Sequence, residues 1–194
     1  MTVALRKPMT LSQFLDWEER QELRYEFDGF QPVAMTGGTL RHELLGNRLR
    51  ALLMAKLEGK RCRLWGPTTK IEVQGRIRYP DAFVSCTAAP LHNTIVPEPV
   101  VVFEILSTGT SRTDRIEKLQ EYQATRSIMR YLILEQDSIA ATVFVRQDDQ
   151  WTARARTRND VLDLPEIGIE LALADIYADA QLEATDSDGG EPGC

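Results

Sequence analysis

Two carboxylates stand inside apolar, strand-like segments of this chain. Asp81 lies in RYPDAFVSC, which begins at Arg78, and Glu104 lies in PVVVFEIL, which ends at Leu106. Burying an unpaired carboxylate is costly, so each acid needs a cation, a base or several hydrogen-bond donors beside it. Two such acids on neighbouring strands would suit a hard divalent cation, because Mg²⁺ binds one or two carboxylates and keeps several waters. The alternative is that each acid pairs with a separate Arg or Lys.

Strand-like patterns around these acids make up most of the middle of the chain. The segment that contains Glu104 is the most continuously apolar, so we expect it to be a central strand. Asp28-Gly29, between two alternating segments, predicts a β-hairpin near the N-terminus. Outside this hairpin, the predicted strands span residues 70–73, 78–86, 99–106 (the segment with Glu104), 130–135, 139–145 and 151–157.

Helical patterns separate these strands. A capping box at Thr10 starts a short helix that ends near residue 19. A second helix is expected over 40–57, a third from Asp114 to Thr125, and a last short one at 173–177. In the third helix, the pattern predicts a buried face of Ile116, Leu119 and Gln123.

The order of these elements predicts one α/β domain over residues 1–178. Its mixed central sheet is flanked by helices, with an N-terminal helix and β-hairpin added. Residues 179–194 form an acidic tail with the composition of a disordered segment.

Composition fits an ordinary water-soluble domain. The chain is 43% hydrophobic and 27% charged. It has no apolar run near the roughly 18 residues that span a bilayer, and no signal-peptide pattern, so a cytoplasmic protein is expected. The odd number of cysteines, Cys62, Cys86 and Cys194, predicts no disulfide framework and no zinc site, with Cys86 a core thiol.

The charge distribution tells against a dedicated nucleic-acid binder. The formal net charge is −6, although much of it comes from the tail. Bases outnumber acids between Arg41 and Arg63, and this segment could contact phosphate. A solvated helix face is the commoner explanation for such a run, and the chain has no strong basic bias overall.

The order of helix, strands, acids and helix resembles the core of the PD-(D/E)XK nuclease superfamily. In that pattern two carboxylates on adjacent strands hold a divalent cation for phosphodiester hydrolysis. A lysine normally follows the second acid by two residues, on the same strand face, but that position is Leu106 here. Lys118, about one turn into the next helix, could supply the amine if the helix runs back over the sheet. Otherwise Lys118 forms an i, i+4 salt bridge with Asp114.

Short motifs keep a fixed order along the chain. They are Arg24-Tyr-Glu-Phe-Asp-Gly29, His42 opening a helix, Tyr79-Pro-Asp81, Phe103-Glu-Ile-Leu-Ser107 and Asp114-Arg-x-x-Lys118-x-x-x-Tyr122. Each has little specificity alone, but their joint order and spacing resemble a restriction endonuclease family called Uma-two, formerly a domain of unknown function. The resemblance covers roughly residues 10–177. That family shares Glu-x-Leu in place of Glu-x-Lys, so Leu106 is a family trait. The turn Ser107-Thr-Gly-Thr-Ser111 departs from the family's usual Ser-Pro-Ser-Thr.

The resemblance implies a restriction-endonuclease-like fold and a metal-dependent DNA endonuclease. It implies Asp81 and Glu104 as ligands of Mg²⁺, or of Mn²⁺, and Lys118 as the relocated catalytic lysine. Glu26 and His42 would line the same catalytic site. DNA is the implied substrate. A homodimer is expected because enzymes that cut both strands of a duplex often work as two-fold dimers.

Each assignment has a simpler alternative. Glu26 could only pair with Arg24 or another base, and His42 could be a polar group at a helix start. Tyr122 would pack the helix with its hydroxyl at the rim. Arg154, Arg156 and Arg158 share one strand face that could contact phosphates, although an exposed face is commoner.

A different class of function also stays open for the whole chain. The fold could be a catalytically inactive module for nucleic-acid or protein interaction, because the strand lysine is missing and the chain is acidic. A Ser- or Cys-dependent hydrolase finds no support, since no Gly-x-Ser-x-Gly occurs.

Overall fold

The computed structural model describes residues 8–35, 37–106, 112–148, 150–178, 180 and 182, with the backbone alone at 112–115. The turn cluster predicted at 107–111 lies outside the described residues, as does the side chain of Asp114, the alternative partner considered for Lys118. Scanning the described helices turns up no apolar segment of bilayer-spanning length.

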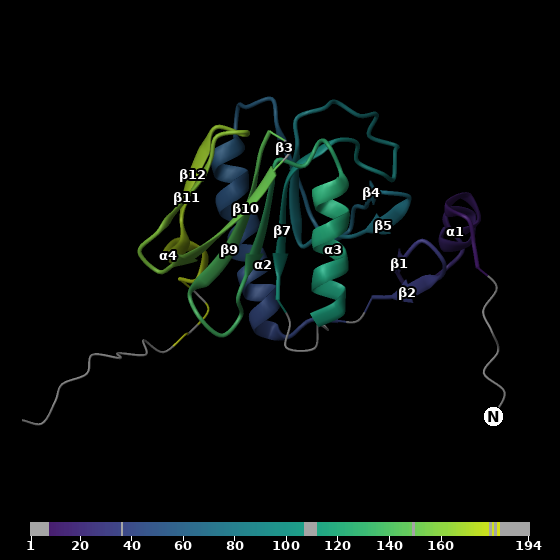
Figure 1. Ribbon diagram of the computed structural model, residues 1–194, viewed down its shortest axis with the longest axis horizontal. Helices are drawn as coiled ribbons and strands as arrows, with labels where there is room; N and C mark the ends of the chain where they lie inside the picture. Colours follow the sequence, from purple (N-terminus) through teal and green to yellow (C-terminus); the bar gives the residue numbers. More distant parts are fainter. Residues whose placement is uncertain are drawn as a thin grey trace, which may run out of the picture.

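A six-stranded mixed sheet forms the centre of the molecule (Figure 1), as predicted. β7, which carries Glu104, is an interior strand and runs parallel to β8, and every other neighbouring pair is antiparallel. In spatial order the strands are β10 (Gln150–Thr157), β9 (Ala140–Gln147), β8 (Arg130–Leu134), β7 (Pro99–Ile105), β6 (Ala82–Ser85) and β3 (Arg63–Trp65).

One long helix covers each face of this sheet (Figure 1). α2 (Leu40–Leu57) packs Leu45, Leu49 and Leu53 on one face, and α3 (Arg112–Ala124) packs Tyr122 on the other. Side chains alternate along a strand, so Phe103 faces α2 while Val102 faces α3. Glu104 shares the face of Val102 and therefore points to α3.

A second, four-stranded sheet lies beside the first (Figure 1) and packs under α1 (Leu11–Glu18). Its strands, in spatial order, are β2 (Pro32–Ala34), β1 (Tyr25–Phe27), β5 (Arg76–Arg78) and β4 (Ile71–Val73). The capping box of α1 and the hairpin of β1 and β2 are as predicted. In the hairpin turn, Oδ1 of Asp28 accepts hydrogen bonds from the backbone N–H groups of Phe30 and Gln31 at 2.7 and 2.8 Å.

The single strand predicted over 78–86 is wrong, because the chain changes sheet within it. β5 ends at Arg78 in the small sheet, and β6 begins at Ala82 in the central sheet. Pro80, between them, has no backbone N–H to donate to a ladder. Asp81 therefore lies at the start of β6 and not in mid-strand.

Two elements near the C-terminus and one near the middle were not predicted as strands. β11 (Val161–Leu164) and β12 (Ile169–Ala172) form a hairpin that joins the core on the α2 side, followed by α4 (Leu173–Ile176). β3 falls in a segment expected to be a connector.

The predicted disordered tail lies mostly outside the described residues. The two tail residues that the structure does describe, Ala180 and Leu182, pack against the core on the α2 side.

Cys62 and Cys86 form a disulfide, which contradicts the prediction that the chain has none. β3 and β6 are antiparallel with Arg63 opposite Ser85, so the next residues outward, Cys62 and Cys86, face each other. Their Cα atoms are 3.9 Å apart, although 24 residues separate them in sequence. Strand register brings these thiols together, and the cysteine count alone carries no register.

Candidate active site

Asp81 and Glu104 come together across the β6–β7 ladder. Ala82 pairs with Phe103, so the position next to that pair would set Asp81 opposite Glu104. Oδ2 of Asp81 accepts a hydrogen bond of 2.7 Å from the backbone N–H of Ile105, one residue beyond Glu104. The two acids of the apolar strand-like segments therefore share one end of the ladder.

The corner that carries Asp81 is tied to the small sheet. The hydroxyl of Tyr79 donates to the carboxylate of Glu18 in α1, and Lys70 forms an ion pair with the same carboxylate. All three side chains are buried. Because a buried network of this kind holds its members in one arrangement, the backbone just before Asp81 is fixed in place.

His42 reaches Asp81 from the first turn of α2. Its Nε2 lies 3.3 Å from Oδ2 of Asp81, and this hydrogen bond raises the pKa of His42 above its ordinary value. Thr39 caps the helix by accepting from the backbone N–H of His42 at 3.1 Å. The buried amide of Gln136 joins this cap to the end of β7, since it accepts from the Thr39 hydroxyl and donates to the Leu106 carbonyl.

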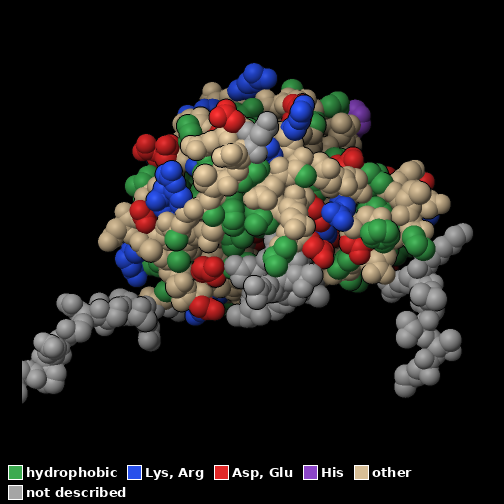
Figure 2. Space-filling model, viewed as in Figure 1, with side chains coloured by type: hydrophobic (Ala, Val, Ile, Leu, Met, Phe, Trp, Pro, Cys, Tyr) green, Lys and Arg blue, Asp and Glu red, His purple; other side chains and the backbone are tan. Residues whose placement is uncertain are grey.

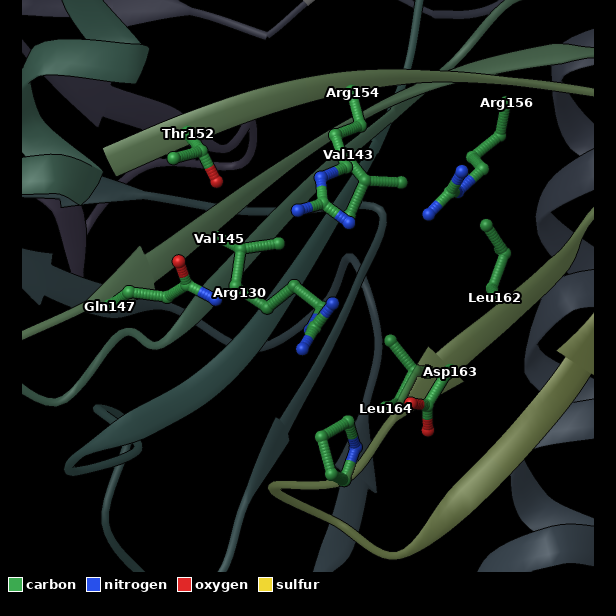
Figure 3. Close-up of a pocket in the computed structure, with 11 residues that line it drawn as sticks. Arg130, Val143, Val145, Gln147, Thr152, Arg154, Arg156, Leu162, Asp163 and Leu164 are labelled. Atoms are coloured by element: carbon green, nitrogen blue, oxygen red, sulfur yellow. The ribbon is translucent and has the colours of Figure 1, made fainter. Parts of the chain in front are cut away.

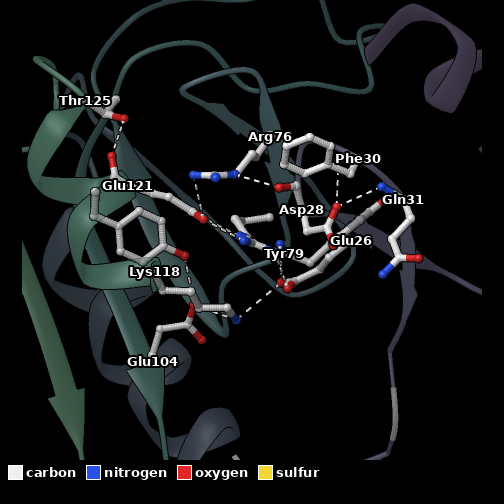
Figure 4. A network of polar contacts seen from close by, with 12 residues as sticks. Glu26, Asp28, Phe30, Gln31, Arg76, Tyr79, Glu104, Lys118, Glu121 and Thr125 are labelled. Atoms are coloured by element: carbon white, nitrogen blue, oxygen red, sulfur yellow. Dashed lines mark hydrogen bonds and ion pairs between the residues drawn. The ribbon is translucent and has the colours of Figure 1, made fainter. Parts of the chain in front are cut away.

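Lys118 reaches the acids from the other face of the sheet. Its Nζ lies 3.3 Å from Oε1 of Glu26 and 3.4 Å from Oε1 of Glu104, and Figure 4 shows it between the two carboxylates. The hydroxyl of Tyr122, one turn further along α3, donates to the same Glu104 oxygen at 2.9 Å. The helix does return over β7, as the relocated lysine requires.

The predicted buried face of α3 is right only in part, because Leu119 packs against the core but Ile116 does not. Ile116 is 46% exposed, whereas Glu121 and Tyr122 are almost completely buried. Tyr122 packs the helix as predicted, but its hydroxyl is buried and donates to Glu104, so it does not lie at the rim. The buried face of this helix includes the polar residues Glu121 and Tyr122, because both meet charged partners there. The spacing of apolar residues could not indicate those partners.

An arginine that the sequence reasoning missed holds Glu26. The guanidinium of Arg78 is buried; it donates to Oε2 of Glu26 at 3.1 Å and makes two bonds of 2.7 Å to Glu121. The backbone N–H of Tyr79 donates to the other oxygen of Glu26 at 3.2 Å. Arg76 adds a partly exposed ion pair to Glu121 (Figure 4). Arg76 and Arg78 are two residues apart, so they share one face of β5. This spacing is the sequence pattern that could have indicated a base for Glu26.

Burial and like charges work on Glu104 together. Burial raises the pKa of Glu104 to about 7, opposed by the ammonium of Lys118 and supported by the charges of Asp81 and Glu26. Carboxylates whose environment shifts their pKa toward neutrality recur at catalytic and metal-binding sites.

The carboxylates have free oxygens that a hard cation could use. Oδ1 of Asp81 and Oε2 of Glu104 accept no hydrogen bond from any described residue. Neither is a buried unsatisfied atom, since the described part of the chain contains none, so both reach solvent. The same residues contain no group of three or more His, Cys, Asp and Glu side chains that could hold an ion. Two carboxylates alone are a donor set that a hard cation could use only with several waters completing its coordination.

All five residues predicted for the site lie in this one cluster. Asp81, Glu104 and Lys118 occupy its centre, Glu26 contacts Lys118, and His42 contacts Asp81. Their catalytic roles stay a prediction.

Two proteins of Synechocystis sp. are similar in sequence to this chain. The chain is 30% identical over 169 residues to an uncharacterized protein, slr1290, of Synechocystis sp. This match covers 85% of this chain and 89% of that protein. A second Synechocystis protein, sll1609, is 23% identical over 141 residues, or 70% of this chain and 80% of the relative.

A solved structure shares the fold. It is the crystal structure of a "putative nuclease belonging to DUF820" from Anabaena variabilis, with a TM-score of 0.73 and 16% identity. The match covers 88% of this chain and 98% of that one. It confirms the predicted nuclease-like α/β fold.

The family comparison covers nearly the whole described domain. The model of the Uma2 family, described as "Putative restriction endonuclease", matches residues 11–174. The matched segment includes Glu26, His42, Asp81, Glu104 and Lys118. The resemblance inferred from the motifs is confirmed, and the chain belongs to the Uma2 family.

Proposed function

We propose that this protein is a metal-dependent endonuclease that hydrolyses phosphodiester bonds in DNA. The observation that carries the proposal is the position of Lys118, whose amine lies beside Glu104 on the sheet end that Asp81 also occupies. Two acids and one amine are the groups that this hydrolysis needs, and here they come from three separate elements. The restriction endonuclease family and the fold of the Anabaena protein support the same proposal.

Asp81 and Glu104 would hold the cation. A divalent ion bound there would polarise the scissile phosphate and lower the pKa of a bound water. The backbone N–H of Ile105 and the imidazole of His42 both contact Oδ2 of Asp81, so they orient its other oxygen. Tyr122 and Lys118 do the same for Glu104.

Lys118 would act on the substrate directly. Its ammonium can orient the attacking water or offset the negative charge that develops on the phosphate. Glu26 holds the amine from the side opposite Glu104 and is itself held by Arg78. The ammonium is therefore preorganised, with little freedom to lose when the substrate binds.

A non-catalytic interaction module is the second candidate. The net charge of −6 favours it, as does the surface, since Lys and Arg side chains are scattered among acids on the face that Figure 2 shows. DNA-binding proteins gain much of their affinity from clustered bases that release counterions. Metal binding separates the two candidates, because an interaction module does not need a cation at Asp81 and Glu104.

The first experiment titrates Mg²⁺ and Mn²⁺ into the wild type and into Asp81→Asn and Glu104→Gln by calorimetry, then adds plasmid DNA. We expect binding and nicking in the wild type and loss of both in each variant. Glu170→Gln is the control, because Glu170 is an exposed acid on β12. Cleavage that survives in both site variants overturns the proposal, and absence of metal binding in the wild type favours the interaction module.

A two-fold dimer would allow both strands of a duplex to be cut in one encounter. We expect the protein to dimerise, at least on DNA. Light scattering with and without a short duplex measures this, and a monomer under both conditions contradicts the expectation.

A further inference from the structure

A separate pocket lies between the central sheet and the β11–β12 hairpin. Its volume is about 290 Å³, and β8, β9 and β10 line one side while β11 lines the other (Figure 3). The lining includes two members of the arginine stripe noted in the sequence, Arg154 and Arg156, together with Arg130. The proposed nuclease activity uses none of these residues.

The pocket has an apolar floor and a polar wall. Val143, Leu162 and Leu164 are buried and form part of the floor. Figure 3 shows Arg154 and Arg156 extending from β10 into the space above Arg130, while Asp163 lies beside Leu164 on the β11 side. A small ligand would therefore meet guanidinium groups beside apolar side chains.

The positive charge of this wall is only partly neutralised. Arg130 is held by Glu166 through two hydrogen bonds of 3.1 and 2.8 Å. Among the residues that the structure describes, Arg156 has only a long contact of 3.9 Å to Asp160. Arg154 makes no hydrogen bond or ion pair with any residue that the structure describes. An anion that enters the pocket would give these two guanidinium groups a close partner that the described residues do not provide.

This pocket is distinct from the acid cluster. Val143 packs on the α2 face of the sheet, whereas Glu104 points to α3. Along the strands, Arg130 pairs with Val101 near the start of β7, and Glu104 lies near its end. A ligand here would not touch Asp81, Glu104 or Lys118.

We infer that the pocket binds a small organic phosphate of the nucleoside monophosphate class, through Arg154 and Arg156. Guanidinium groups bind phosphate in a planar, often bidentate geometry, and they also stack on flat rings. The pocket is roughly ten times the ~30 Å³ that one water occupies, so a bound phosphate has room for an organic body over the apolar floor.

The test is calorimetric titration of the full chain with dAMP, dGMP, inorganic phosphate and deoxyadenosine. We expect at least one nucleotide to bind, more tightly than inorganic phosphate or the nucleoside, and more weakly as salt rises. Arg154→Ala should weaken nucleotide binding about tenfold or more, since a charge-assisted hydrogen bond is lost. Arg158→Ala is the matched control, because Arg158 is exposed on the same chain segment and does not line the pocket.

The outcomes separate this inference from the nuclease proposal. Asp81→Asn should bind the nucleotide as the wild type does, whether or not it cleaves DNA. No binding of either nucleotide, or equal binding by wild type and Arg154→Ala, overturns the inference; so does equal binding of nucleoside and nucleotide. A 5′-phosphorylated oligonucleotide identifies the source: if it competes with the nucleotide, the pocket holds a strand end, and if it does not, the pocket holds a free nucleotide. Both results support the pocket.

Discussion

The amine of Lys118 lies 3.4 Å from Oε1 of Glu104, although 14 residues separate the two in sequence. On the strand itself, the position two residues after Glu104 is Leu106. α3 runs back over β7, and its Lys118 supplies the amine that the strand lacks. A lysine ammonium thus lies beside the second acid, but a helix supplies it and not the strand.

Replacing Lys118 tests whether this amine is catalytic. Lys118→Met removes the charge and keeps much of the volume, and we expect DNA cleavage under single-turnover conditions to fall about 10²–10³-fold. Metal binding should persist, because Asp81 and Glu104 are unchanged. Plasmid nicking with saturating Mn²⁺ measures the rate.

A rescue variant makes the same prediction sharper. Leu106 follows Glu104 by two residues and shares its strand face. Leu106→Lys in the Lys118→Met background should therefore recover part of the lost rate. Full cleavage by Lys118→Met alone would contradict a catalytic role for this amine.

Divalent-ion affinity should rise with pH through neutrality. Burial raises the pKa of Glu104 to about 7, so below that pH the cation must displace a proton. The hydrogen bond to Asp81 raises the pKa of His42, and loss of that proton on the rising side acts in the same direction. Titration of Mn²⁺ at pH 6 and pH 8 should show weaker binding at pH 6, and equal affinities would count against Glu104 as a ligand.

Arg78 should be important for stability, in contrast to its neighbour Arg76. Arg78→Met leaves Glu26 and Glu121 buried without their main base, which typically costs about 3–5 kcal/mol of unfolding free energy. Arg76→Met is the matched control, since its ion pair to Glu121 is partly exposed and such pairs contribute about 1 kcal/mol or less. Urea denaturation followed by circular dichroism gives both values. Equal losses in the two variants would mean that the buried network is not centred on Arg78.

The disulfide should be detectable by thiol counting. In the denatured, unreduced protein, one of the three cysteines, Cys194, should react as a free thiol. After reduction all three should react. The double variant Cys62→Ser/Cys86→Ser should lose about 3 kcal/mol of stability, the usual contribution of a loop of this size. Cys194→Ser should leave stability unchanged. Three reactive thiols before reduction would show that the disulfide is not formed.

Much of the fold could be predicted from local pattern. The helix over 40–57 has the predicted bounds, the capping box at Thr10 forms, and the apolar segment around Glu104 is an interior strand. These features depend on residues within one or two turns of each other, and their spacing is written directly in the chain. The family also follows from short motifs in a fixed order, and the five residues that those motifs indicated lie in one cluster.

The errors share a different physical origin. The strand predicted over 78–86 divides between two sheets, and α3 buries Glu121 and Tyr122 in place of Ile116. In each case the outcome depends on which segment packs opposite. Local periodicity could not anticipate a buried polar face whose charged partners lie on other elements.

The sequence alone therefore determined which residues could do chemistry, namely two acids in apolar strands, a lysine on a helix and a stripe of arginines. Tertiary structure decided which of them meet. Strand register brought Asp81 to the end of the β6–β7 ladder near Glu104 and Cys62 opposite Cys86, and the return of α3 placed Lys118 beside Glu104. The physical reason is that elements form from short-range spacing, whereas a site needs contacts between distant segments, which only the packing of the whole core fixes.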